Sequence, residues 1–286
     1  MTVSPPRIDA HQHFWAVERG DYGWLTPDLA PLYRDFLPAD LKPHLNRHEI
    51  DGTILVQAAP TVAETRFLLE LADRTPSVRG VVGWADFAAP DAPDRIAGLA
   101  AHPRLVGLRP MIQDIADDDW MLRPDLDPAF RALVAHDLTF DALTLPRHLD
   151  RLLTLLGRYP DLRTVIDHGS KPRIRDRDFE DWAASMSRLA QETSAFCKLS
   201  GLVTEAAEAW TTDDLRPYTD HLLTSFGPGR LIWGSDWPVC TLGASYDRWV
   251  ETTETLLADL GDADRAAIMG GNALTAYGLA TSAYST

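Results

Sequence analysis

Cysteine is nearly absent from this chain of 286 residues, which carries Cys197 and Cys240 alone. Two cysteines cannot build a disulfide framework, and neither belongs to a spacing that is typical of a zinc site. Proteins without such a framework are typical of reducing compartments, so we expect two buried free thiols and a cytoplasmic location.

Positive charge and long apolar runs are also scarce. The chain has 27 lysine and arginine residues against 42 aspartate and glutamate residues, which gives a net charge of −15. This balance disfavours binding to nucleic acid or to an anionic membrane, because both depend on clustered basic side chains. No stretch approaches the roughly 18 apolar residues that span a bilayer, and the start of the chain lacks an apolar segment typical of a signal peptide. The expected partner is a small molecule, and nothing in the sequence indicates an oligomeric state.

The chain is rich in short apolar runs that alternate with amphipathic segments, a pattern typical of a parallel sheet covered by helices. Runs such as GTILVQA and RLIWGSDW are almost continuously apolar, as strands covered on both faces are. We predict eight strands, at residues 7–14, 52–58, 80–87, 106–112, 139–143, 163–167, 195–199 and 230–234.

Eight strand–helix units favour an α/β fold, a single (β/α)₈ barrel of the TIM type that forms one domain over residues 1–286. An open, doubly wound sheet is the alternative, but no glycine-rich phosphate loop follows the first predicted strand. Two segments, residues 15–37 and 112–127, are longer than a barrel needs. Both follow strands, on the side where barrel active sites are built, so we expect lids or substrate-binding loops there.

The strongest chemical signal is the pair His11 and His13 at the end of the first predicted strand. Side chains alternate along a strand, so both imidazoles point in the same direction, into the mouth of the barrel. Two imidazoles on one face can bind a divalent cation or polarise a substrate oxygen. A pair of this kind is of moderate specificity by itself.

Two further residues stand at predicted strand ends. His168 follows the apolar run TVI, and Asp236 lies in the turn GSDWP after the last strand. A carboxylate at that position can ligate a metal and can accept a proton from water as a general base. We predict His168 and Asp236 as catalytic residues, and His11, His13, His168 and Asp236 as the ligands of a single metal site.

Several other side chains occupy the same end of the predicted barrel and are candidates for substrate binding. Arg109 can hold oxygen atoms through its fork of donors, or can form an interior ion pair with Asp141. Lys171 can supply a cation for a carboxylate or a polarised carbonyl. The predicted substrate-binding residues are Gln57, Trp84, Arg109, Asp141, Lys171 and Trp15.

Other hydrolytic chemistries lack their motifs. The sequence has no Gly-x-Ser-x-Gly elbow for a serine hydrolase and no His-Glu-x-x-His helix for a metalloprotease. Cys240 lies near Asp236 in the chain but has no evident activating group, so thiol catalysis is a minor alternative.

Six motifs together resemble one known group of proteins. The motifs are HQHFW at 11–15, VGLRP at 106–110, DHGSKP at 167–172, CKLSG at 197–201, GSDWP at 234–238 and GGNALTAYGL at 270–279. Their combination is similar to the amidohydrolase superfamily, and within it to the amidohydrolase-2 branch that holds sugar lactonases of the L-fuconolactonase and L-rhamnonolactonase type. The likeness runs from the first predicted strand to the last helix.

The resemblance implies a distorted (β/α)₈ barrel that opens a sugar lactone to its aldonic acid. In that superfamily the last-strand aspartate, which matches Asp236, takes a proton from the attacking water. Many members bridge two metals through a lysine at the end of the fourth strand, but this chain has Arg109 there and Asp141 in place of a histidine on the fifth. The resemblance therefore implies one divalent metal, zinc, or a reaction that requires none.

Three alternatives remain open at this point. The same residues could serve a metal-dependent decarboxylase of the same branch, or a lactonase that acts on a pyrone dicarboxylate. A third alternative is a protein without catalytic activity that binds sugar acids.

Overall fold

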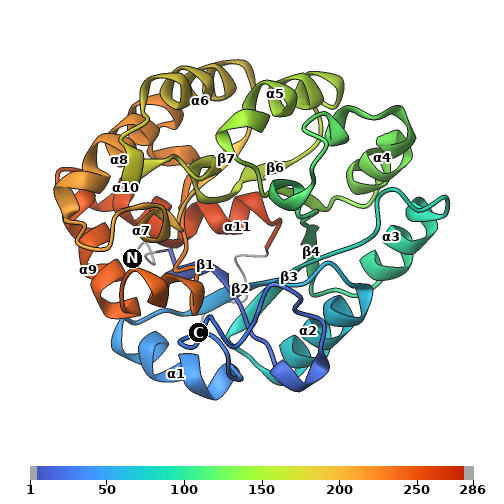
Figure 1. Ribbon diagram of the computed structural model, residues 1–286, viewed down its shortest axis with the longest axis horizontal. Helices are drawn as coiled ribbons and strands as arrows, with labels where there is room; N and C mark the ends of the chain where they lie inside the picture. The colour runs from blue at the N-terminus through green and yellow to red at the C-terminus, as the bar shows by residue number, and fades with distance from the viewer. Residues whose placement is uncertain (1–4, 280–286) are drawn as a thin grey trace.

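The computed structural model describes residues 5–279, which form a barrel of parallel strands inside a ring of helices (Figure 1). The eight strands pair with their neighbours in the order of the chain, from β1 to β8. All eight predicted strands are present, and no end differs from its predicted position by more than four residues. The strands are β1 Ile8–Gln12, β2 Gly52–Val56, β3 Val78–Gly83, β4 Leu105–Leu108, β5 Thr139–Ala142, β6 Thr164–Ile166, β7 Phe196–Leu199 and β8 Leu231–Trp233.

The barrel closes where the end of β1 meets the segment that follows β8. Gln12 and Trp237 form a parallel bridge, and the backbone N–H of His13 donates to the carbonyl of Trp237 at 2.7 Å. The N–H of Asp236 donates to the carbonyl of His11, also at 2.7 Å. The predicted barrel is therefore confirmed, and the open sheet is excluded.

The helices cover the outer face of the sheet and bury an apolar side against it. In α5, for example, Leu149, Leu152, Leu155 and Leu156 are buried, at the spacing of one face of a helix. The helices are α1 Pro38–Arg47, α2 Val62–Arg74, α3 Ala92–Ala100, α4 Asp127–Ala135, α5 Leu149–Arg158, α6 Glu180–Glu192, α7 Leu202–Glu205, α8 Thr212–Phe226, α9 Tyr246–Leu256, α10 Asp262–Ala266 and α11 Asn272–Ala276.

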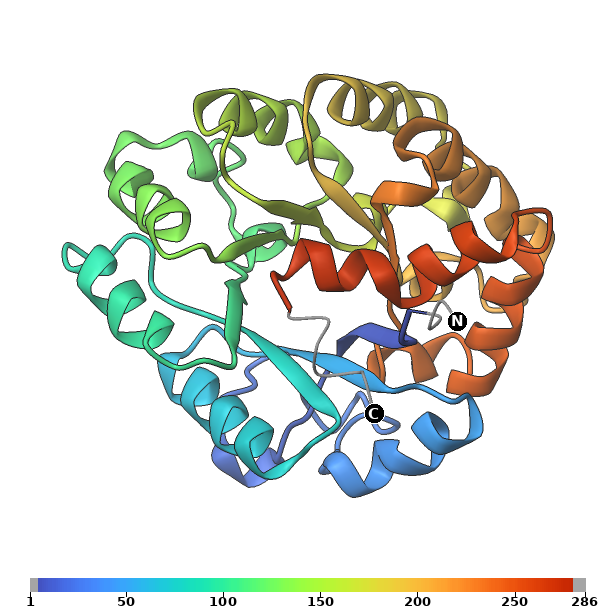
Figure 2. The ribbon, with the colours of Figure 1, turned by 180° about the vertical axis from the view of Figure 1, so that it is seen from behind.

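The C-terminal helix α11 covers the end of the barrel at which the strands begin, and Figure 2 shows it crossing that face in red. Asn272 Nδ2 donates to the carbonyl of Leu231 at the start of β8, at 2.7 Å. Thr139 Oγ1, at the start of β5, donates to the carbonyl of Ala276 at 2.7 Å. With this end closed, the cavity of the barrel opens at the other end, where the strands finish.

The two long segments after strands lie at that open end. Residues 15–37 contain one short 3₁₀ turn, Val17–Arg19, and antiparallel pairing between Trp15 and Phe36 joins the two ends of the segment. Residues 112–127 contain three 3₁₀ turns, Ile112–Asp114, Trp120–Leu122 and Pro124–Leu126. Both cysteines are buried and free, as predicted. Among the described residues, no helix combines the length and the apolar character needed to cross a membrane.

Candidate active site

Three imidazoles converge on one carboxylate oxygen at the open end of the barrel. Oδ1 of Asp236 lies 3.2 Å from Nε2 of His13, 3.7 Å from Nε2 of His11 and 3.9 Å from Nε2 of His168. All four side chains are buried. The four residues predicted as metal ligands therefore lie together, although they come from three different strand ends.

The backbone that presents His168 and Asp236 has an unusual conformation. His168, Ser170 and Lys171 have φ values of 55°, 60° and 51°, and Asp236 has a φ of 58°. A left-handed conformation costs about 1–2 kcal/mol for each residue that has a Cβ. Such strain is retained at functional sites when the surrounding structure enforces it. Here it turns two side chains inward directly after their strands.

The arrangement around His13 fits a bound cation. Nδ1 of His13 lies 2.8 Å from the carbonyl of Val56, and because a carbonyl can only accept, Nδ1 carries a proton. In a neutral ring Nε2 then has a lone pair, which faces the carboxylate of Asp236. Two acceptors at 3.2 Å need a cation between them, or a second proton on the imidazole. Neighbouring ligands of tetrahedral zinc lie about 3.3 Å apart, so the His13–Asp236 distance suits either case.

The buried charges hold Asp236 and His168 in defined protonation states. Burial raises the pKa of the Asp236 carboxyl, but His168, the hydrogen bond with His13, and His11 together outweigh burial and keep it well below its usual range. Burial lowers the pKa of His168 to about 4, against the attraction of Asp236 and Asp167. Near neutral pH the site therefore contains a carboxylate beside a neutral imidazole.

A network of buried ion pairs lies beneath the histidines. Nζ of Lys198 is 2.6 Å from Asp141 Oδ2, 2.9 Å from Asp167 Oδ1 and 3.1 Å from His11 Nδ1. The hydroxyl of Tyr277, directly after α11, donates to Asp141 Oδ2 at 2.8 Å. Lys198 thus compensates two carboxylates that would otherwise be buried without a partner, and it holds one edge of the His11 ring.

Arg109 occupies the other edge of the His11 ring. Its Nη1 donates to Asp167 Oδ2 at 3.2 Å and lies 3.3 Å from His11 Nε2. Its Nη2 donates to the carbonyl and the side-chain oxygen of Gln57, and Gln57 Nε2 donates back to the carbonyl of Arg109 at 2.9 Å. Nε of Arg109 is buried and has no hydrogen-bond partner among residues 5–279, which leaves one donor of the guanidinium unused.

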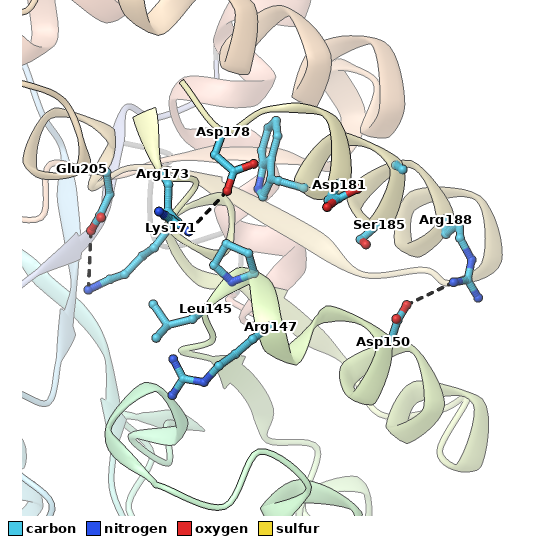
Figure 3. A pocket seen from close by; sticks show the side chains of 13 residues that line it. Leu145, Arg147, Asp150, Lys171, Arg173, Asp178, Asp181, Ser185, Arg188 and Glu205 are labelled. Carbon is cyan, nitrogen blue, oxygen red and sulfur yellow. Dashed lines mark hydrogen bonds and ion pairs between the residues drawn. The ribbon is translucent and has the colours of Figure 1, made fainter. Parts of the chain in front are cut away.

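A cavity of about 310 Å³ opens above these groups. One part of its wall is polar and carries His13, His168 and Asp236 with Arg109, Gln113, Asp114 and Lys171, and the rest is apolar. Lys171 also lines an outer cavity of about 820 Å³, which is shown in Figure 3. There its Nζ reaches toward Glu205, at 4.0 Å from Oε1. This long contact leaves the lysine able to approach a ligand in the smaller cavity.

The predicted substrate-binding residues lie in different places. Arg109 and Lys171 line the smaller cavity. Trp84 lines a neighbouring cavity of about 610 Å³, which shares Trp24, Met111 and Asp114 with the smaller one. The other three lie away from the described cavity wall: Gln57 holds Arg109, Asp141 holds Lys198, and Trp15 is buried against Trp24.

Sequence reasoning missed the functions of some buried polar residues. Glu64, on α2, accepts hydrogen bonds from the N–H groups of Ala58 and Ala59 at the end of β2. Burial raises its pKa to about 7. The pattern Thr-x-x-Glu at residues 61–64 is typical of a helix start and could have drawn attention to it. Asp9 was also overlooked; it accepts from the N–H of Ser235 at 2.8 Å and so links β1 to the turn that carries Asp236.

The fold and the site together define a class of protein: a (β/α)₈-barrel hydrolase with a histidine–aspartate cluster at the carboxyl ends of its strands. The cluster contains two groups that could hold a metal ion, His11–His13–Asp236 and His11–Asp167–His168. The amidohydrolase family model matches residues 8–279. The chain belongs to the amidohydrolase family.

Two curated relatives match nearly the whole chain. An L-fucono-1,5-lactonase from Burkholderia ambifaria is 48% identical over 275 residues, which cover 95% of both chains. An L-fucono-1,5-lactonase from Burkholderia multivorans is 38% identical and covers 96% of both. Among solved structures, an amidohydrolase from Burkholderia multivorans with bound zinc has a TM-score of 0.90 and 38% identity, over 96% of this chain and 100% of that one.

Proposed function

We propose that this chain is a lactonase that hydrolyses L-fucono-1,5-lactone, or a close aldono-lactone, to the aldonic acid. The observation that carries the proposal is the convergence of His11, His13 and His168 on one oxygen of Asp236. The two L-fucono-1,5-lactonases described above, at 48% and 38% identity, support this choice of substrate.

The cavity suits a small sugar lactone. Its volume of about 310 Å³ is at the small end for ligand sites. Arg109, Gln113 and Lys171 offer hydrogen-bond donors to the hydroxyl groups. The apolar remainder of the wall suits the methyl group of a 6-deoxy sugar; it is formed by Leu29, Leu32, Leu143, Val239 and Leu242 with Trp24, Ala58 and Met111.

Asp236 is the base of the proposed reaction. A water molecule beside its carboxylate attacks the lactone carbonyl carbon and gives a proton to Asp236. The bond between that carbon and the ring oxygen then breaks, and Asp236 returns the proton to the ring oxygen. The product is a hydroxy acid, so every atom of the lactone and the water is accounted for.

The depressed pKa of Asp236 makes it a weak base, so the carbonyl must also be polarised. Donors already in place can stabilise the negative charge that develops on its oxygen. Arg109 offers its unpartnered Nε. His168, whose Nδ1 is 2.8 Å from Ser200 Oγ, presents Nε2 to the cavity. Lys171 supplies a further positive charge.

The donor set of His11, His13 and Asp236 also fits one zinc ion. His168, whose Nε2 lies 3.9 Å from Asp236 Oδ1, would be the fourth ligand. Zinc would supply a Lewis acid for the carbonyl oxygen. The roles of the remaining groups are the same in both cases: Asp236 orients the water, and Arg109 and Lys171 hold the substrate.

The test is hydrolysis of a lactone panel, followed with a pH indicator on protein of known zinc content, before and after chelation. The panel contains L-fucono-, L-rhamnono-, L-galactono- and D-arabinono-lactones and a pyrone dicarboxylate. We expect the highest kcat/KM with L-fucono-1,5-lactone. Turnover of the pyrone alone, or of none of the panel by zinc-loaded and zinc-free protein, would overturn the proposed substrate.

A further inference from the structure

The environment of His11 differs from that of the other histidines, because a cation lies against each of its ring nitrogens. Lys198 Nζ is 3.1 Å from Nδ1, and Arg109 Nη1 is 3.3 Å from Nε2. Both cations can only donate hydrogen bonds. A neutral imidazole has one lone pair, so it can accept from only one of them at a time.

Nδ1 of His11 also lies near an acceptor, which allows this nitrogen to carry the proton of the neutral ring. Oδ1 of Asp167 lies 3.5 Å from it and can accept its proton. Lys198 loses little in that arrangement, since it keeps Asp141 and Asp167 as acceptors. With the proton on Nδ1, the lone pair is on Nε2 and is directed toward the guanidinium of Arg109.

A metal in the His11–His13–Asp236 group would need this same lone pair. The hydrogen bond from Arg109 and a bond to the metal therefore exclude each other at His11 Nε2. The guanidinium is also a permanent positive charge, and it is held in place from the other side by Gln57 and Asp167. Its approach to His11 is part of a fixed arrangement.

We propose that Arg109 competes with a divalent metal for His11, so that zinc binding requires the Arg109–His11 hydrogen bond to break. The protein then carries its own cation at the edge of the site and binds zinc less tightly than the same ligands would without Arg109. This inference concerns metal affinity and does not depend on which lactone is the substrate.

The experiment is a zinc titration of metal-free, full-length protein in competition with a chromophoric chelator. In Arg109→Met the stem of the side chain remains, but the charge and the donors are gone. We expect its zinc Kd to fall by about 10- to 100-fold, the range by which groups beside metal ligands alter affinity. An unchanged or higher Kd in the folded variant would overturn the proposal.

Lys171→Met is the matched control, because Lys171 lines the same cavity, whereas the cations at the ring nitrogens of His11 are Arg109 and Lys198. We expect its zinc Kd to stay within about threefold of the wild-type value, as for a solvent-screened charge. If the zinc Kd fell by the same factor in both variants, the cause would be the loss of a positive charge near the site, and competition at His11 would be refuted.

A measurement on the unaltered protein covers the case in which Arg109→Met does not fold. Crystal structures are determined after chelation and after addition of zinc. With zinc bound, we expect Arg109 Nη1 to have left hydrogen-bonding distance of His11 Nε2. Zinc held by His13, His168 and Asp236 with the Arg109–His11 contact intact would show that the two do not compete.

Discussion

Gly201 lies directly against the imidazole of His168. A Cβ at this glycine would be 2.6 Å from Nδ1 of His168 and 2.7 Å from its Cγ, closer than real Cβ contacts. The φ of Gly201 is also positive, at 65°. The glycine that follows β7 therefore defines one wall of the slot in which the histidine after β6 stands.

We expect Gly201→Ala to move His168 out of line with Asp236. A displacement of this size costs about 10²-fold in kcat, and the left-handed backbone adds about 1–2 kcal/mol of destabilisation. Steady-state kinetics and urea unfolding check both effects. Gly157→Ala in α5 is the control, because its new Cβ would meet nothing within 4 Å. This control should keep full activity and gain about 0.5–1 kcal/mol of stability.

Replacement of Asp236 tests the proposed base. Asp236→Asn keeps the shape of the side chain but cannot take up the proton, so we expect kcat to fall by about 10²–10⁴. KM should change much less, since Arg109 and Lys171 still hold the substrate. The exposed Asp178→Asn serves as the control and should behave as wild type. Wild-type kcat in Asp236→Asn would assign the proton transfer to another group.

The buried lysine has a role in stability that can be measured separately from activity. Lys198→Met leaves Asp141 and Asp167 without their shared cation, and we expect a loss of about 3–5 kcal/mol in unfolding free energy. Adding Asp141→Asn removes one of the two stranded charges. The double variant should therefore recover about 1–3 kcal/mol by urea unfolding. No recovery would mean that Asp141 is not stabilised by Lys198.

Glu64 gives the stability a pH dependence of known sign. Burial raises its pKa to about 7 in the folded protein, against an ordinary value of 4.5. The folded state therefore keeps a proton that the unfolded chain releases, and this contribution is largest below pH 4.5 and is lost as the pH rises to about 7. The full change is about 3 kcal/mol.

Urea unfolding at pH 5 and pH 8 checks this expectation by comparison between variants. We expect Glu64→Gln to lose less stability than wild type between the two pH values, because glutamine does not titrate. Glu70→Gln is the control, since Glu70 is exposed on the same helix. Equal pH dependence in wild type and Glu64→Gln would assign the titration to other groups.

Much of the fold could be predicted because a strand covered on both faces must be almost continuously apolar. GTILVQA and RLIWGSDW carry that signature and became β2 and β8. The four residues of the histidine–aspartate cluster could be predicted from the sequence for a related reason. Each lies at or just after a strand end, and in a barrel all strand ends of one kind meet at one opening.

The partners of the interior charges could not be predicted in the same way. Lys198 lies within an apolar run, and its bonds to Asp141 and Asp167 depend on the register of three neighbouring strands. Trp15 was assigned to the substrate by its position after β1, yet the protein uses it to pack against Trp24 and Phe36. A single sequence reports which residues are apolar or charged, but not which neighbours the loops bring to them.

Closure of the barrel determines when the active site can form during synthesis of the chain. His13 and Asp236 are 223 residues apart in the chain, and they meet only when β1 has joined the segment after β8. At the usual rate of translation, Asp236 is synthesised about 10–45 s after the histidine pair. The active site is thus a property of the finished polypeptide, and a chain interrupted before β8 has the histidines but no base.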